Sequence, residues 1–197
     1  MNERSKKLNL VKKNTFSSKD AVMVGLTYYE LNQMVQAGLL IKEGRAVFVK
    51  KNAPRNSESE HYAIALAQLG EPSALCLWSA LVFHDLTEEA PSDIWVYVTY
   101  EKTTKLKIRA VRKRNPQWNI GIEDYQGIRC TNIERTLVDA MADRKHFTET
   151  QAYKMAMDAI RMKKTNFHKL FEMAKKLKVE KRLGRDLLIL EESYVQR

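Results

Sequence analysis

The first fifty residues contain three short segments in which apolar positions recur at helical spacing. Residues 3–13 form a basic segment with an apolar side. Ser17 precedes Asp20 by three residues, and Thr27 precedes Glu30 by the same number. This is the spacing of a capping box at the start of a helix. The apolar positions of the third segment are Leu31, Met34 and Val35. The pattern predicts three short helices.

Two β-prone runs follow, at residues 39–41 and 46–49, and a short segment that contains Gly44 joins them. This arrangement predicts a β-hairpin. Three helices followed by a hairpin are the element order of a winged helix-turn-helix. Only Gly25 and Leu26 separate the second and third predicted helices, which suits the sharp turn of that motif.

The polar, proline-containing segment 52–56 is the boundary that we predict between two domains. An S-x-x-E pattern that begins at Ser57 predicts a new helix over residues 57–69. We therefore expect a winged helix-turn-helix domain at residues 1–52 and a second domain at residues 57–197.

The second domain begins with alternating apolar and charged runs. Residues 73–86 are almost wholly apolar and predict buried helical turns, although the first half could be a strand. Residues 94–98 predict a buried strand, and in residues 102–114 cations alternate with apolar positions, as in a strand with one wet basic face. Weaker β patterns occur at residues 118–120 and 127–130.

From residue 131 onward the spacing is helical. The predicted capping boxes are Thr131 with Glu134 and Thr148 with Gln151. Two further amphipathic segments, at residues 166–177 and 183–194, have one apolar stripe each. The whole chain therefore predicts an α+β protein, in which a mixed sheet packed by helices follows the winged helix-turn-helix.

Charge is unevenly distributed along the chain. The net charge is +10, but residues 1–52 contribute +6, residues 53–100 contribute −6 and residues 101–197 contribute +10. Two separate basic surfaces indicate a polyanionic partner, because phosphate neutralisation supplies most non-specific nucleic-acid affinity. A lysine-rich solvated surface is the simpler alternative. The chain has no apolar run that could span a bilayer and no signal-peptide pattern, so we expect a cytoplasmic protein that does not enter a membrane.

In a winged helix-turn-helix the third helix enters the major groove through its N-terminal half, and the hairpin contacts the backbone or the minor groove. Asn and Gln side chains can read adenine, and Tyr hydroxyls can reach phosphates. The predicted DNA-binding residues are Ser17, Lys19, Thr27, Tyr28, Tyr29, Asn32, Gln33, Gln36, Arg45, Lys50 and Lys51. Such modules also serve as protein-contact domains, and Tyr28 or Tyr29 could be part of the core.

A second basic surface is predicted around the alternating strand and the helical tail. Its residues are Lys102, Lys105, Lys107, Arg109, Arg112, Lys113, Arg114, Lys163 and Lys164. A charged strand face is often only solvated or protects a sheet edge from aggregation. The run has no acid between Lys102 and Arg114, which is more positive charge than edge protection requires.

The sequence lacks the spacings that catalytic and metal sites use. Its seven glycines form no phosphate-binding loop, and its four histidines have no paired-ligand spacing. Cys76 and Cys130 lie far apart and are expected to be buried thiols. The D-x-K pattern at Asp143 to Lys145 falls at a predicted helix end instead of a nuclease strand. We therefore expect no enzymatic activity, no cofactor and no metal.

Two stretches carry a resemblance to a known family. Residues 79–91 read SALVFHDLTEEAP and residues 131–141 read TNIERTLVDAM. Together with the predicted winged helix-turn-helix, the chain resembles the AbiEi family of bacterial antitoxins, which belong to type IV abortive-infection systems of phage defence. The resemblance is most specific at SAL-x-x-H, which ends at His84, and at ERTLVDA. Asp85 stands where we expect glycine, which puts the local turn in question.

The resemblance implies a transcriptional autorepressor that binds inverted repeats in the promoter of its own operon. It also implies that the C-terminal domain counters a nucleotidyltransferase toxin without forming a tight complex with it. We expect a monomer in solution and several copies on DNA. A plain transcription factor with a sensing or dimerisation domain, and a nuclease, are the alternatives.

Overall fold

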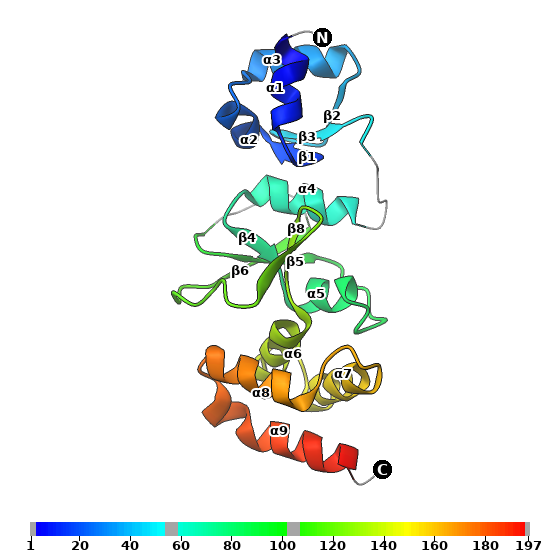
Figure 1. Cartoon of the computed structure of the whole chain (residues 1–197), viewed down its shortest axis with the longest axis vertical. Helices are drawn as coiled ribbons and strands as arrows, with labels where there is room; N and C mark the ends of the chain where they lie inside the picture. Colours follow the sequence, from blue (N-terminus) through cyan, green and yellow to red (C-terminus); the bar gives the residue numbers. More distant parts are fainter. Residues whose placement is uncertain (1–2, 54–58, 102–106, 196–197) are drawn as a thin grey trace. The chain divides into compact units, whose positions relative to one another are not determined.

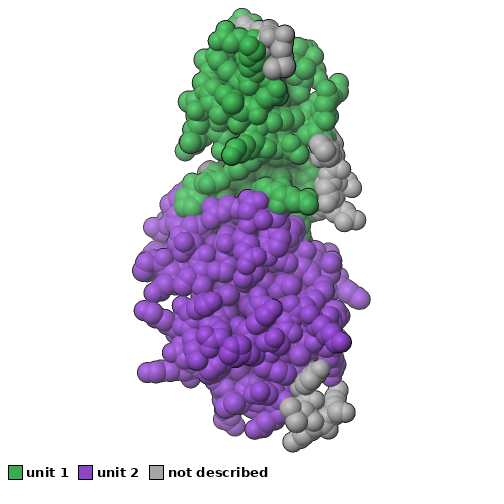
Figure 2. Space-filling model, in the orientation of Figure 1, with its two compact units in different colours: residues 1–73, 126–128 green, residues 74–125, 129–197 purple. Residues whose placement is uncertain are grey.

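The computed structural model describes residues 3–53, 59–101 and 107–195 as a mixed α/β protein with two sheets (Figure 1). This composition is compatible with the predicted α+β class. The chain divides into two compact units (Figure 2). Unit 1 comprises residues 1–73 and 126–128, and unit 2 comprises residues 74–125 and 129–197.

Unit 1 contains the three predicted helices and the predicted hairpin. Its elements in chain order are α1 (Glu3–Leu10), β1 (Thr15–Ser17), α2 (Ser18–Met23), α3 (Tyr28–Gln36), β2 (Leu40–Lys42), β3 (Val47–Lys50) and α4 (Glu60–Leu69). The sheet has the order β1-β3-β2, with both pairs antiparallel. Strand β1 was not predicted, because three residues are too few to show alternation and their partner β3 is distant in sequence.

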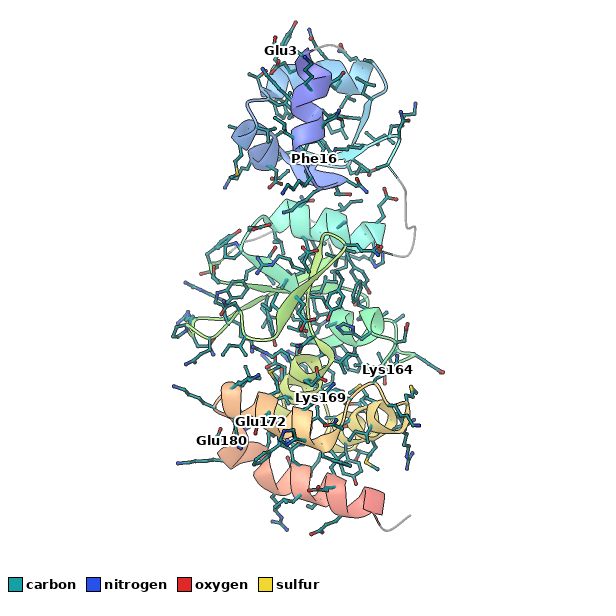
Figure 3. All side chains as sticks on the ribbon, viewed as in Figure 1. Glu3, Phe16, Lys164, Lys169, Glu172 and Glu180 are labelled. Atoms are coloured by element: carbon teal, nitrogen blue, oxygen red, sulfur yellow. The ribbon has the colours of Figure 1, made fainter. Side chains whose placement is uncertain are left out.

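The core of unit 1 forms where the helices cover this sheet. Phe16 of β1 (Figure 3) faces Phe48 of β3 in register. Their rings stack with centroids 6.0 Å apart. Around them lie the buried side chains of Val11, Ala21, Leu26, Leu31, Met34 and Leu40. Gly25 lies between α2 and α3 with φ +79°, a conformation that costs glycine little and most other residues much.

Helix α4 belongs to unit 1, although the predicted domain boundary places it in the second domain. It packs on β1 and β3, and its buried residues include Tyr62 and Leu69. The helix begins at Glu60, and its N-cap residue Ser59 makes no side-chain capping bond. Ser57, on which the S-x-x-E pattern depends, lies outside the described residues, as does most of segment 52–56. The boundary at that segment stays a prediction.

The second sheet has five strands in the order β6-β5-β4-β8-β7. Its strands and the helices of the C-terminal half are β4 (Ser73–Leu75), α5 (Leu77–Phe83), β5 (Ile94–Val98), β6 (Ile108–Arg112), β7 (Ile122–Tyr125), β8 (Ile128–Thr131), α6 (Ile133–Ala142), α7 (Glu149–Arg161), α8 (Phe167–Lys176) and α9 (Glu180–Val195). Strands β5 and β6 run parallel, as do β4 and β8. The apolar run 73–86 therefore supplies a strand and a helix in succession.

Two local predictions in this half are wrong. The segment Trp118–Ile120 is a turn, because the amides of Trp118 and Ile120 bond to carbonyls three residues earlier and cannot join a sheet. The strand that was missed, β7, follows it. Helix α6 is capped by Asn132 instead of Thr131, which ends β8. The predicted box at Thr148 and Gln151 is confirmed at the start of α7.

The core of unit 2 lies between the sheet and the helical layer. Helix α5 packs on β5 and α6, and α6 in turn contacts α7, α8 and α9 (Figure 1). Small and branched residues of α6, such as Leu137 and Val138, are fully buried in this cluster. Leu183, Leu187 and Leu190 bring α9 into it. No helix in the described ranges has both the length and the apolar character needed to cross a bilayer.

A buried charged network connects α6 with the sheet. The carboxylate of Asp139 accepts from the Tyr97 hydroxyl at 2.9 Å and from Nε of Arg135 at 2.5 Å. Nη1 of Arg135 donates to the Ile120 carbonyl, and Nζ of Lys113 lies 3.8 Å from Asp139. Arg135 is only 1% exposed. Burial and the neighbouring carboxylate raise the pKa of Tyr97 well above its usual value, so this hydroxyl stays protonated and donates.

We expect Arg135→Met to lower the free energy of unfolding by about 3–5 kcal/mol, because it leaves the buried Asp139 carboxylate without its main partner. Urea titration followed by circular dichroism measures the loss. The control is Arg144→Met, which removes more exposed ion pairs with Asp186 and Glu149 and should cost less than about 1 kcal/mol. Equal losses in the two variants would show that the network adds nothing beyond a surface pair.

Candidate functional site

Helix α3 presents polar side chains on the surface of unit 1 along its whole length. Tyr28 is 47% exposed and Tyr29 is 68% exposed. Asn32 and Gln33, one turn later, are half-buried, and Gln36 is exposed. Residues three and four apart share a helix face, so Tyr29, Asn32, Gln33 and Gln36 form one stripe along α3. We call these four residues the α3 stripe.

Two of the predicted DNA-binding hydroxyls are engaged in helix caps. Ser17 Oγ accepts from the Asp20 amide and donates to its carboxylate. Thr27 Oγ1 is bound in the same way to Glu30. These boxes satisfy amide groups that the first turn of a helix leaves unpaired, so Ser17 and Thr27 position α2 and α3.

Tyr28 connects the start of α3 to the hairpin. Its hydroxyl accepts a hydrogen bond from Nζ of Lys42 at 2.9 Å, and its ring lies edge-on to Phe48, with centroids 6.2 Å apart. The ring therefore contacts the core while nearly half of the residue stays exposed. Lys42 was not among the predicted residues. Its position at the end of β2, within reach of α3, is a tertiary feature.

The predicted hairpin cations have different surroundings. Arg45 and Lys51 are exposed, as is Lys19 of α2. Lys50 instead donates from Nζ to the carbonyl of Val11 just after α1, and burial lowers its pKa. Lys50 therefore holds two segments of unit 1 together.

The basic strand of unit 2 is only partly a basic surface. Lys102 and Lys105 lie outside the described residues. The exposed cations are Lys107, Arg109, Arg112 and Arg114, which we call the β6 cations. Lys113 turns inward, where its ammonium group lies 4.3 Å from the centroid of the Tyr97 ring and near Asp139.

Lys163 and Lys164 are adjacent but have different roles. Lys163 is exposed. Lys164 (Figure 3) instead donates to the carbonyls of His84 and Asp85 at 2.7 and 3.0 Å. These carbonyls lie at the end of α5, so the lysine caps that helix. Asp85 has φ +51°, the left-handed conformation that glycine adopts most easily and that Asp tolerates. The turn that the resemblance put in question thus keeps a glycine-like backbone.

His84 lies between strand and helix in the most specific stretch of the resemblance. Its Nε2 lies 2.7 Å from the Thr131 carbonyl and 3.7 Å from Sγ of Cys130. Burial lowers the pKa of His84 and raises the pKa of the Cys130 thiol. A neutral imidazole that donates to a carbonyl, next to a protonated thiol, is a packing arrangement; the reactive form of cysteine is the thiolate.

The described parts of the chain contain no group of three His, Cys, Asp or Glu side chains arranged to hold a metal ion.

We expect Lys164→Ala to lower the free energy of unfolding by about 1.5–3 kcal/mol, because two charge-assisted hydrogen bonds to carbonyl groups are lost. Lys163→Ala is the matched control and should change it by less than about 0.5 kcal/mol. Urea titration of both full-length variants provides the comparison. If Lys164→Ala left the free energy of unfolding unchanged, the capping role would be contradicted, and Lys164 would again count among the surface cations.

Comparison of the sequence with models of known protein families and with curated proteins found no match.

Proposed function

We propose that this protein is a DNA-binding autorepressor and antitoxin, in which unit 1 is a winged helix-turn-helix that reads promoter DNA. The observation that carries the proposal is the α3 stripe. It lies on a helix that follows a tight turn, and the exposed Lys42 bonds to the first residue of that helix. The predicted resemblance to the AbiEi antitoxins gives the proposal its antitoxin part.

The topology of unit 1 supports this assignment. The order α1-β1-α2-α3-β2-β3, with a sheet order of β1-β3-β2, supports the proposal because three helices followed by an antiparallel hairpin are the elements expected of a winged helix-turn-helix. In such a module α3 enters the major groove and the β2–β3 hairpin is the wing. The bond from Lys42 to Tyr28 fixes the hairpin against the first turn of α3. The helix and the wing would therefore approach DNA as one rigid surface.

The side chains divide into two groups by their chemistry. The amides of Asn32, Gln33 and Gln36 can donate to and accept from base edges, which gives sequence preference. The exposed cations Lys19, Arg45 and Lys51 suit phosphates, which supply affinity without sequence information. Lys42 joins the second group through its position next to Tyr28.

We expect Asn32→Ala and Gln33→Ala to reduce the preference for promoter over random DNA by about 1–3 kcal/mol each, if each side chain reads a base. Arg45→Ala and Lys51→Ala should weaken binding to both DNAs and reduce the salt slope by about one. Fluorescence anisotropy over a range of salt concentrations measures both effects. Lys145→Ala, which removes an exposed cation from unit 2, is the control.

If the two pairs of variants had the same effect on promoter and random DNA, α3 would not be the reading helix. If none of them changed promoter binding, unit 1 would be a protein-contact module instead.

The second part of the proposal assigns the antitoxic role to unit 2. Its exposed β6 cations present positive charge to a polyanionic partner. A nucleotidyltransferase acts on phosphate-bearing substrates, so such a surface could oppose its effect by binding the substrate without binding the toxin tightly. This role requires no bond-making step by the protein itself.

We expect the full-length protein to restore growth to cells that express the neighbouring nucleotidyltransferase toxin. A triple variant, Lys107→Ala with Arg112→Ala and Arg114→Ala, should protect poorly while it still represses the promoter. The control removes three exposed cations elsewhere in unit 2, at Lys145, Lys154 and Lys181. Colony counts and a promoter reporter measure the two functions separately.

Absence of protection by the wild-type protein would leave a plain transcription factor. Cleavage of DNA by the purified protein with Mg²⁺ would indicate a nuclease and contradict the proposal.

A further inference from the structure

Unit 2 contains a pocket of about 190 Å³ beside the β6 cations. Trp78 of α5, Trp95 of β5 and Arg109 of β6 line it, together with Glu89 and Asp93 from the segment that joins α5 to β5. Pockets for drug-sized ligands are roughly 300–1,000 Å³, so this one suits a single small group. Nothing in the proposed function uses these aromatic and acidic residues.

Packing holds the aromatic walls of the pocket in place. Trp95 is 5% exposed, with the guanidinium of Arg109 4.6 Å from its ring centroid and the His146 ring edge-on at 4.8 Å. The Trp78 ring stacks on Phe147 with centroids 4.5 Å apart. Planar groups that are already fixed lose little freedom when a further planar group stacks on them.

Charges of opposite sign meet at this pocket. Glu89 and Asp93 supply carboxylate oxygens, which accept hydrogen bonds from amino groups. Arg109 lines the pocket from β6, and the exposed Lys107 lies two residues before it, on the same face of the extended chain. Cations of this kind bind phosphate. A ligand with an amino-bearing ring and a phosphate matches both sets.

We propose that this pocket binds one unpaired base of a single-stranded nucleic acid, with the amino edge of the base toward the carboxylates and the phosphates toward the β6 cations. Bases in single strands can be stacked on aromatic rings or guanidinium planes and read on their Watson–Crick edges. This inference rests on the proposed function only in giving unit 2 a polyanionic partner. Promoter reading by unit 1 does not enter it.

A lysine or arginine side chain of a basic partner protein is the competing occupant, since indoles and carboxylates also attract cations. Two observations disfavour it. The guanidinium of Arg109 already lies over the Trp95 ring, and a basic peptide would be repelled by the β6 cations.

The test measures the affinity of the full-length protein for short, fluorescently labelled oligocytidine and oligouridine RNAs. Cytosine and uracil have the same size, but cytosine presents an amino donor where uracil presents a carbonyl oxygen. We expect oligocytidine to bind about tenfold more tightly, because carboxylates accept from that amino group. Oligodeoxycytidine in a parallel titration shows whether the 2′-hydroxyl contributes.

Variants separate the pocket from general charge. Arg109→Ala should weaken binding about tenfold more than Arg114→Ala, which removes the same charge from the same basic segment outside the pocket. Trp78→Ala should weaken binding to both RNAs about tenfold, and Trp78→Phe should retain most of the affinity. If Trp78→Ala does not fold, the Phe variant and the arginine pair still decide the matter.

The change that Asp93→Asn causes in the affinity for each RNA is the sharpest readout. If its carboxylate accepts from the base, Asp93→Asn removes the preference for oligocytidine. If the carboxylate only repels phosphate, Asp93→Asn tightens binding to both RNAs equally, and the inference is wrong.

If Arg109→Ala and Arg114→Ala weakened RNA binding equally, and the protein did not prefer either base, the inference about the pocket would be wrong. The charged-surface part of the proposed function would still stand. A short arginine-rich peptide serves as the competitor. If this peptide binds the wild-type protein more tightly than the RNA does, and if Trp78→Ala abolishes its binding, the pocket belongs to a protein partner instead. If the wild-type protein neither protected cells from the toxin nor bound the promoter, the proposed function itself would be wrong.

Discussion

The buried carboxylate of Asp139 is the contact on which the arrangement of unit 2 depends. It accepts from Tyr97 of β5 and from Arg135 one helical turn earlier in α6, while Lys113 approaches it from just beyond β6. Each of these groups would be costly to bury alone. Because they can be satisfied only together, α6, β5 and the segment after β6 must assemble in one arrangement. Gly121 fits against this network, where an added Cβ would lie 2.8 Å from Cβ of Arg135.

The candidate functional surfaces lie next to such fixed contacts. In unit 1 the capping boxes determine where α2 and α3 begin, so that the turn at Gly25 joins two short, well-defined helices. In unit 2 the Trp78 ring, which stacks on Phe147, and the Trp95 ring, which is held by Arg109 and His146, form walls of the pocket, and β5 carries both Trp95 and Tyr97. Rigid walls and exposed cations at their edge are what recognition of a planar, charged ligand requires.

Local sequence patterns predicted where helices and strands lie better than they predicted which segments pair with one another. The boxes at Ser17, Thr27 and Thr148 need only residues three apart, so spacing alone located them. Strand β1 depends on pairing with β3, which is distant in the sequence, so a short window could not predict it. The segment Trp118–Ile120 has β-prone residues but bonds within its own turn, so residue type alone predicted the wrong structure there. The candidate site shows the same division: the exposure of Arg45 follows from a glycine-containing turn, whereas the bonds of Lys50 and Lys164 follow from tertiary contacts.

The sequence by itself determined the mixed α/β class, the helices with capping boxes and the two regions of positive charge, because periodicity, caps and charge are properties of neighbouring residues. Only the tertiary structure decided which cations stay exposed. Lys113, Lys164 and Lys50 look like their neighbours in the sequence, but each is drawn to a buried ring, a helix end or a carbonyl from elsewhere in the chain. The pocket at Trp78 and Trp95 has the same origin, since its walls come from three elements that meet only in the folded protein.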